Sequence, residues 1–112
     1  MKSLRNKVQL IGNLGMDPEV KNLNNGKKMA RFTMATGEFY KDKNGNRVED
    51  TQWHNVVVWG NLVQIVETYL KKGNEVAIEG KLVHRSYETS TGEKKYVTEV
   101  VANDLVMLRK AQ

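Results

Sequence analysis

The sequence predicts an all-β fold, a barrel of five strands with one helix between strands 3 and 4. Three observations lead to this prediction. Residues of opposite character alternate in the expected strands, which is the period of a half-buried strand. Turn dipeptides interrupt the alternation, and in each the glycine can adopt the positive φ that tight hairpins need: Asn25-Gly26, Asn44-Gly45 and Thr91-Gly92. A single stretch has helical spacing, and it lies between the third and fourth expected strands.

The expected strands follow in order along the chain. The first begins near Val8, is broken by glycines and a proline, and resumes over residues 19–23. The others are expected at about residues 29–40, 51–59, 75–87 and 95–102, with a short apolar segment at 105–108.

The expected helix has an apolar stripe at i, i+3, i+4 spacing, formed by Leu62, Ile65, Val66, Tyr69 and Leu70. Asn61 fits the N-cap, Lys71 and Lys72 fit the negative C-terminal end, and Gly73 fits the position just past it. Three strands, a helix and two strands is the order of the five-stranded Greek-key OB-fold barrel, and other small barrels lack a helix at that point. We therefore expect one OB-fold domain over residues 1–108, followed by a short basic end at 109–112.

The composition excludes several classes of function. Without cysteine the chain has no disulfide scaffold, thiolate zinc site or thiol nucleophile. Its two histidines are thirty residues apart with no carboxylate cluster beside them, so we expect no metal site, no cofactor and no enzyme activity. No apolar run approaches the ~20 residues that cross a bilayer, so no membrane partner is expected. The net charge of +5 favours a polyanionic partner such as nucleic acid.

The third expected strand carries the most information. With a period of two, Trp53, Asn55 and Trp59 share one face, and His54 lies on the other. The tryptophan face is either core or an open surface. Asn55 favours an open surface, because a buried amide needs partners that water supplies outside. The tryptophans would be ~20 Å apart, so on an open face they would engage different nucleotides of an extended single strand.

Two further aromatics, Tyr40 and Tyr87, stand beside cations in expected loop or strand-end positions, whereas Tyr69 and Tyr96 are expected to pack against the core. The periodicity places His54 on the side of Val56 and Val58, where it is either a core residue or an interface residue. For basic residues elsewhere, such as Lys41, the sequence allows two roles, a solvated loop charge or a contact to the partner.

Five segments together closely resemble the bacterial single-stranded-DNA-binding protein family: NKVQLIGNLG (6–15), DPEV (17–20), QWHNVVVWG (52–60), YLKKG (69–73) and IEG (78–80). The resemblance implies an OB-fold homotetramer in the cytoplasm, associated with the nucleoid, that wraps single-stranded DNA with little sequence preference in replication, recombination and repair. The same resemblance implies base stacking by four aromatic residues, Tyr40, Trp53, Trp59 and Tyr87. It implies phosphate or polar contacts by Lys7, Thr33, Lys72 and Arg85, and a subunit contact by His54.

One departure from the family concerns the end of the chain. Family members usually continue into a Gly/Pro/Gln-rich linker with an acidic tip that recruits repair enzymes, whereas this sequence stops at Arg109-Lys110-Ala111-Gln112. Recruitment of tail-dependent repair and replication proteins is therefore not expected of this form. The alternative function is an OB-fold protein-interaction subunit of a replication-restart primosome, which would not need four exposed aromatics. A small OB-fold nuclease would need a carboxylate or metal cluster.

Overall fold

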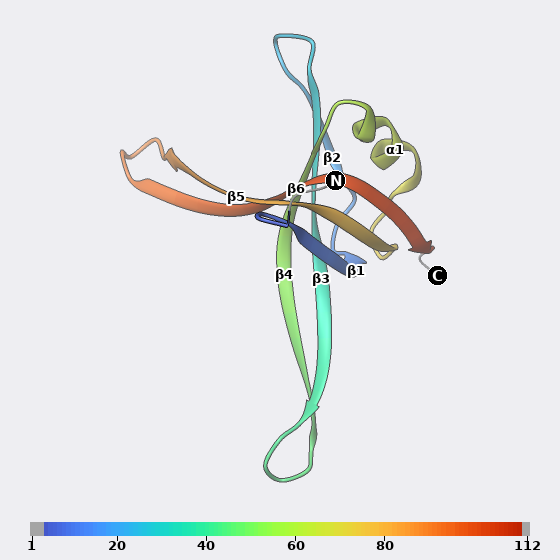
Figure 1. Ribbon diagram of the computed structural model, residues 1–112. Coiled ribbons are helices and arrows are strands. Elements are labelled where there is room, and N and C mark those ends of the chain that lie inside the picture. Colours follow the sequence, from blue (N-terminus) through green and yellow to red (C-terminus); the bar gives the residue numbers. More distant parts are fainter. Residues whose placement is uncertain (1–3, 111–112) are drawn as a thin grey trace.

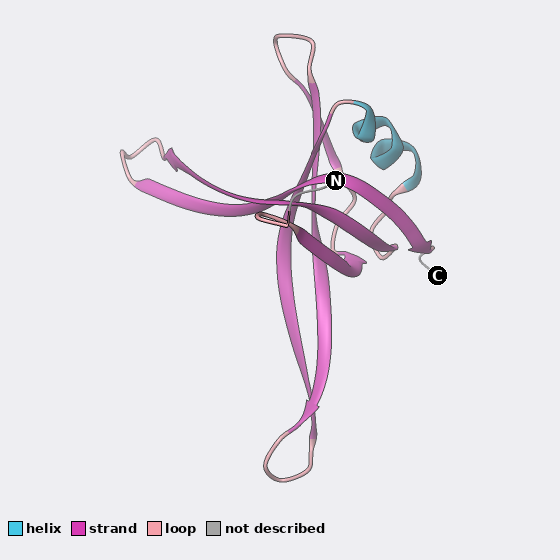
Figure 2. Ribbon diagram, in the orientation of Figure 1, coloured by secondary structure: helices cyan, strands magenta, loops and turns pink. Residues whose placement is uncertain are grey.

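The structure of the chain is a computed structural model that describes residues 4–110. Over this range six strands and one helix follow one another: β1 (Val8–Leu14), β2 (Glu19–Asn22), β3 (Lys28–Lys41), β4 (Arg47–Trp59), α1 (Asn61–Tyr69), β5 (Glu75–Glu88) and β6 (Lys94–Arg109). Strands form most of the molecule, and α1 lies to one side of them (Figure 2).

The strands close into a ring. β1 pairs with β5, β5 with β6, β6 with β4 and β4 with β3, and β3 returns to the end of β1 at Leu14. The pairing of β4 with β6 is parallel and the other pairings are antiparallel. β2 pairs only with β3, and together β1 and β2 are the broken first strand that the sequence indicates. The prediction of a five-stranded OB barrel with its helix after the third strand is confirmed.

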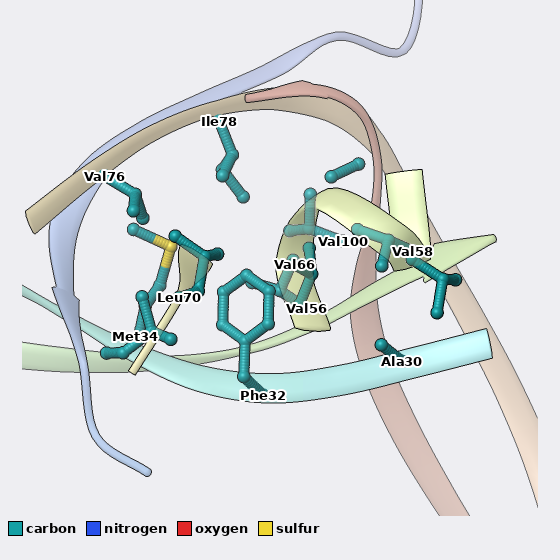
Figure 3. Close-up of a cluster of buried hydrophobic side chains, with 13 residues drawn as sticks. Ala30, Phe32, Met34, Val56, Val58, Val66, Leu70, Val76, Ile78 and Val100 are labelled. Carbon is teal, nitrogen blue, oxygen red and sulfur yellow. The ribbon is translucent and has the colours of Figure 1, made fainter. Parts of the chain in front are cut away.

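The core lies inside this ring (Figure 3). β3 contributes Phe32 and Met34, β4 contributes Val56 and Val58, and all four side chains are almost fully buried. Figure 3 shows Phe32 near the centre of the group. β5, α1 and the residue just after α1 supply further buried apolar side chains to the same cluster: Val63, Val66, Leu70, Val76 and Ile78.

Two hairpins project from the barrel as long arms, β3–β4 in one direction and β5–β6 in another (Figure 1). The radius of gyration of 16.1 Å accordingly exceeds the ~13 Å expected for a compact chain of this length. β4 begins at Arg47, four residues earlier than expected, because residues 47–50 continue the ladder with β3. Both faces of this arm are exposed, so no apolar alternation marks it as a strand.

The expected end of the last strand at residue 102 is wrong, because β6 continues to Arg109. Gly80 pairs with Ala102 while Glu79 pairs with Asp104, which leaves Asn103 as an extra residue in a bulge. A bulge shifts the alternation by one residue. This shift made residues 105–108 look like a separate segment.

The predicted ends of the helix are also wrong. The N-cap is Gly60, with φ 67°, and Asn61 is the first helical residue. The helix ends at Tyr69, so Lys71 and Lys72 lie beyond its last turn. Gly73 does have a positive φ of 91°, but it belongs to the turn that leads into β5.

The buried face of α1 is rotated relative to the predicted stripe. Val63, Val66 and Leu70 are buried, whereas Ile65 and Tyr69 are exposed. At 100° per residue, Val63 lies within about 60° of both Val66 and Leu70, and Ile65 lies far from that centre. The expectation that Tyr69 packs against the core is therefore wrong.

Candidate nucleic-acid interface

The outer face of β4 is an open surface. Trp53 is 63% exposed and Trp59 is 43% exposed, whereas Val56 and Val58 on the opposite face are fully buried. Asn55 lies between the tryptophans and is also exposed. Val57 on the same face is buried, at 4% exposure, but the exposure of both tryptophans and of Asn55 excludes the core interpretation for these three side chains. The surface formed by Trp53, Asn55, Val57 and Trp59 is called the tryptophan face below.

Trp53 is positioned by a glycine. The loop after β1 brings Gly15 against the indole so closely that an added Cβ would lie 3.0 Å from Cη2 of Trp53 and closer still to Cζ3. The same Cβ would lie 2.9 Å from Oγ1 of Thr33, and the Gly15 amide donates a 2.9 Å hydrogen bond to the Thr33 carbonyl. The indole therefore lies against bare backbone beside Thr33.

The tryptophan face continues across the sheet onto the β5–β6 arm. Thr33 is paired with Asn55, Asn55 with Glu99, and Glu99 with Val83, so these four residues form one row. A hollow of about 460 Å³ lies on this surface. The residues lining it include Thr33, Asn55, Arg85, Tyr87 and Glu99. The structure thus brings three of the expected site residues together, Thr33, Arg85 and Tyr87.

Arg85 is held in place by a carboxylate. Its Nε donates to Oε1 of Glu99 at 2.8 Å, and a terminal nitrogen donates to Oε2 at 3.1 Å. Glu99 is buried, while the Arg85 side chain is 53% exposed. The hydrogen bond and the charge of Glu99 raise the pKa of Arg85 above its ordinary value, so the guanidinium stays charged. Of its five N–H donors, three remain for an anion.

Tyr40 lies on the β3–β4 arm and is about half exposed. The ladder between β3 and β4 runs without a shift from Met29 to Lys41. Alternation therefore places Tyr40 on the side of Phe32 and Met34, not on the tryptophan face.

Phe39, by alternation, lies on the side of the tryptophan face instead, and it is 57% exposed. The Arg47 guanidinium lies over its ring, 4.0 Å from the centroid. The sequence reasoning missed this residue. The sequence does place Phe39, by steps of two from Ala35, on the side of its strand opposite Phe32 and Met34, but only the register with Trp53 assigns that side to the tryptophan face.

The remaining expected site residues are dispersed. Lys7 forms an ion pair with Glu79 at 3.7 Å. Lys72 is exposed after α1, and its backbone amide donates to Oδ1 of Asp17 at 2.9 Å. His54 is half-buried, with Nε2 2.9 Å from Oγ1 of Thr36.

Tyr96 does not pack against the core, contrary to expectation. It is 77% exposed and pairs with Ser86, which places it on the opposite face of the β5–β6 arm from Tyr87. Lys94 lies 5.7 Å from its ring centroid.

Neither a metal centre nor a membrane span is found in the described part of the chain. Residues 4–110 contain no group of three or more histidine, cysteine or acidic residues arranged to hold a metal ion. Within the same range no helix has the length and apolar character needed to cross a bilayer.

An OB barrel whose open sheet face carries exposed aromatics interleaved with cations has the architecture of single-strand nucleic-acid-binding proteins. The chain belongs to the Single-strand binding protein family, which it matches over residues 5–108.

Relatives and solved structures agree with this assignment. The chain is 51% identical over 104 residues to Single-stranded DNA-binding protein 1 of Chlorobaculum tepidum, covering 92% of this chain and 64% of the relative. It is 44% identical to Single-stranded DNA-binding protein 1 of Xylella fastidiosa, covering 96% and 79%. The fold resembles a Plasmodium falciparum SSB in complex with ssDNA, with a TM-score of 0.85, 39% identity, and coverage of 96% of this chain and 97% of that one. The chain thus spans just under two thirds of the length of the Chlorobaculum protein.

Proposed function

We propose that this chain binds single-stranded DNA without sequence preference, in replication, recombination and repair in the cytoplasm. Bases stack on Tyr40, Trp53, Trp59 and Tyr87, and phosphates contact Lys7, Thr33, Lys72 and Arg85. The observation that carries the proposal is the pair of exposed tryptophans on one strand face with a solvated amide between them. Every base has a π-face, so stacking platforms bind a strand whatever its sequence. The role is binding and protection, without chemistry on the DNA.

Arg85 fits this role because its charge is fixed in direction. Two of its N–H donors are bound to Glu99, and this bidentate pair fixes the orientation of the guanidinium. The remaining donors therefore point in a defined direction. A guanidinium held in this way loses less side-chain entropy when a phosphate binds. Tyr87 lines the same hollow. One nucleotide can therefore stack its base on Tyr87 while Arg85 binds its phosphate.

The test is the binding of a fluorescently labelled oligo-dT to single alanine variants, followed by anisotropy. Trp53→Ala and Trp59→Ala should each weaken binding by about 5- to 150-fold, which corresponds to about 1 to 3 kcal/mol per stacked base. Oligonucleotides of mixed sequence should show similar losses. If both variants fold and bind as tightly as the unmodified protein, the proposal is wrong.

A matched pair on the β5–β6 arm provides the control. Tyr87→Ala removes an aromatic ring from the side of the hollow, and Tyr96→Ala removes the same ring from the opposite face. Only the first should weaken binding. If neither aromatic variants nor added salt changes binding, the protein-interaction alternative in a replication-restart primosome is favoured instead.

We further propose that the protein assembles as a homotetramer with His54 at a subunit contact. Two features support self-association. β3 pairs with β1 only at Asn13 and Leu14, so the edge of β1 from Val8 to Gly12 lacks a strand partner on that side within the described chain. Ile11 and Val106, each more than half exposed, lie in one row of the β1–β5–β6 sheet through Ala77. An unpaired edge beside exposed apolar side chains is a surface suited to a second copy.

A further inference from the structure

A second hollow lies at the far end of the tryptophan face from Trp53. Its volume is about 510 Å³. One wall is formed where β4 passes into α1, and the other is the turn between β2 and β3, at the opposite end of β3 from the β3–β4 arm (Figure 1). We call it the Trp59 hollow, and its lining residues are Gly26, Lys27, Lys28, Trp59, Gly60 and Asn61.

The local backbone fixes the two lysines beside the indole. The Gly26 amide donates to the Leu23 carbonyl at 3.0 Å, and the Leu23 amide donates to the Lys27 carbonyl at 2.8 Å, which closes a tight turn. Gly26 has φ 81°, a conformation that favours glycine. The Gly60 amide donates to the Lys28 carbonyl at 3.3 Å and so joins this turn to the end of β4. Both lysine backbones are thereby held next to Trp59.

The Trp59 hollow is cationic and has no carboxylate in its lining. Lys27 and Lys28 are exposed, and no ion pair found among residues 4–110 includes either of them. The nearest cation of the first hollow differs in this respect, because Arg31 is bound to Glu19 at 3.1 Å. Two lysines without an acidic partner that line the same hollow as an exposed indole favour an anionic ligand that also carries a flat ring.

The Trp59 hollow is continuous with the surface already described. Arg31 and Val57 face each other across β3 and β4 and line the first hollow. The next pair on the same face is Met29 with Trp59, two residues or ~7 Å farther along the strands. A single strand of DNA that leaves the first hollow along the tryptophan face therefore reaches the Trp59 hollow next.

Base stacking on Trp59 belongs to the proposed function; we propose in addition that Lys27 and Lys28 bind the phosphates that flank this base, so that the Trp59 hollow is a nucleotide subsite. The inference rests on the proposed binding of single-stranded DNA and extends its path to the turn between β2 and β3. Long lysine side chains bind phosphates as point charges and read no base edge, so the subsite is compatible with any sequence.

The test compares two double variants that remove the same charge. Lys27→Gln/Lys28→Gln removes both ammonium groups of the subsite. Lys71→Gln/Lys110→Gln is the control, because Lys71 lies in another hollow beside Asp17 and Glu67 and Lys110 follows β6. The subsite variant should reduce the slope of log affinity against log salt by about 1.4, which is about 0.7 per phosphate, and this amounts to roughly a 25-fold loss at 0.1 M salt. The control variant should leave the slope nearly unchanged.

A combined variant tests whether the base and the phosphates belong to one nucleotide. If they do, Trp59→Ala added to Lys27→Gln/Lys28→Gln should weaken binding by less than the product of the two separate losses. A clean product of the losses would place the lysine contacts elsewhere and overturn the subsite.

Two other results separate this inference from the proposed function. If the unmodified protein does not bind oligo-dT, the proposed function itself fails. If it binds, and the subsite variant behaves like the control, the function stands and the subsite is wrong. The subsite is equally wrong if its variant retains DNA binding but loses binding to a poly-glutamate peptide, because the hollow would then be a site for acidic peptides.

Discussion

Replacing Gly15 with alanine tests whether the orientation of Trp53, and not only its presence, determines DNA binding. The new Cβ would lie 3.0 Å from Cη2 of Trp53 and closer still to Cζ3. Carbon atoms that are not bonded prefer separations of about 3.5 to 4.0 Å, so the indole must move by about 1 Å. Trp53 is 63% exposed and has few neighbours that would resist the movement.

The expected cost falls on binding and not on folding. A displaced indole loses part or all of the ~1 to 3 kcal/mol that a stacked base contributes, so Trp53→Ala sets the upper limit of the effect. We expect Gly15→Ala to weaken oligo-dT binding by about 5-fold or more. Its melting temperature should stay close to that of the unmodified protein, because the moving side chain is largely exposed.

The matched control is Gly37→Ala. Gly37 lies in β3 on the side that continues the tryptophan face. A Cβ there would meet nothing closer than Oε1 of Glu49 at 3.5 Å, which is an ordinary contact. Anisotropy with labelled oligo-dT, together with thermal unfolding, measures both variants. The reasoning is refuted if Gly15→Ala binds as tightly as the unmodified protein while Trp53→Ala does not.

Three other substitutions have defined expected outcomes. Glu99→Gln removes the negative charge beside Arg85 but leaves an amide oxygen that can accept from the guanidinium, so DNA binding at low salt should strengthen while urea unfolding shows a loss of about 1 to 2 kcal/mol of stability; unchanged binding would show that Arg85 takes no part in it. Phe39→Ala should weaken oligo-dT binding by about 5-fold or more in an anisotropy titration, since its ring has the parity of the tryptophan face; full affinity would show that the DNA does not reach the β3–β4 arm. His54→Glu should raise the concentration at which the oligomer dissociates, followed by light scattering during dilution, and a monomeric unmodified protein at micromolar concentration would remove the premise.

Alternation predicted the parts of the fold in which one face is buried. Val56 and Val58 face the core, so the parity of β4, and with it the exposed tryptophans, could be read from the sequence. The barrel order followed from the turns and from the position of the helix. The arms could not be delimited in this way, because with both faces exposed the residues carry no burial pattern.

Two local errors have the same physical origin, a change of phase that composition does not mark. The bulge at Asn103 shifts the alternation of β6 by one residue. In α1 the apolar residues outnumber the positions that face the core, and the small side chain of Val63 occupies the centre of the buried face in place of Ile65. The roles expected from the family resemblance for Tyr40, Lys7 and Lys72 remain predictions, since the structure places these residues away from the first hollow.

The closure of the barrel through β1 has a consequence for how the chain folds. Val8 pairs with Gly80, and the side chain of Asn6 bonds the backbone of Leu82, so the first strand finds its partner only after most of the chain exists. The β3–β4 hairpin needs only local contacts and can form much earlier. Synthesis at about 5 to 20 residues per second leaves on the order of several seconds between the emergence of β4 and that of β6. During that interval the apolar side of the hairpin has no sheet to cover it, and the rate at which β5 and β6 are translated sets how long it stays open to misassembly.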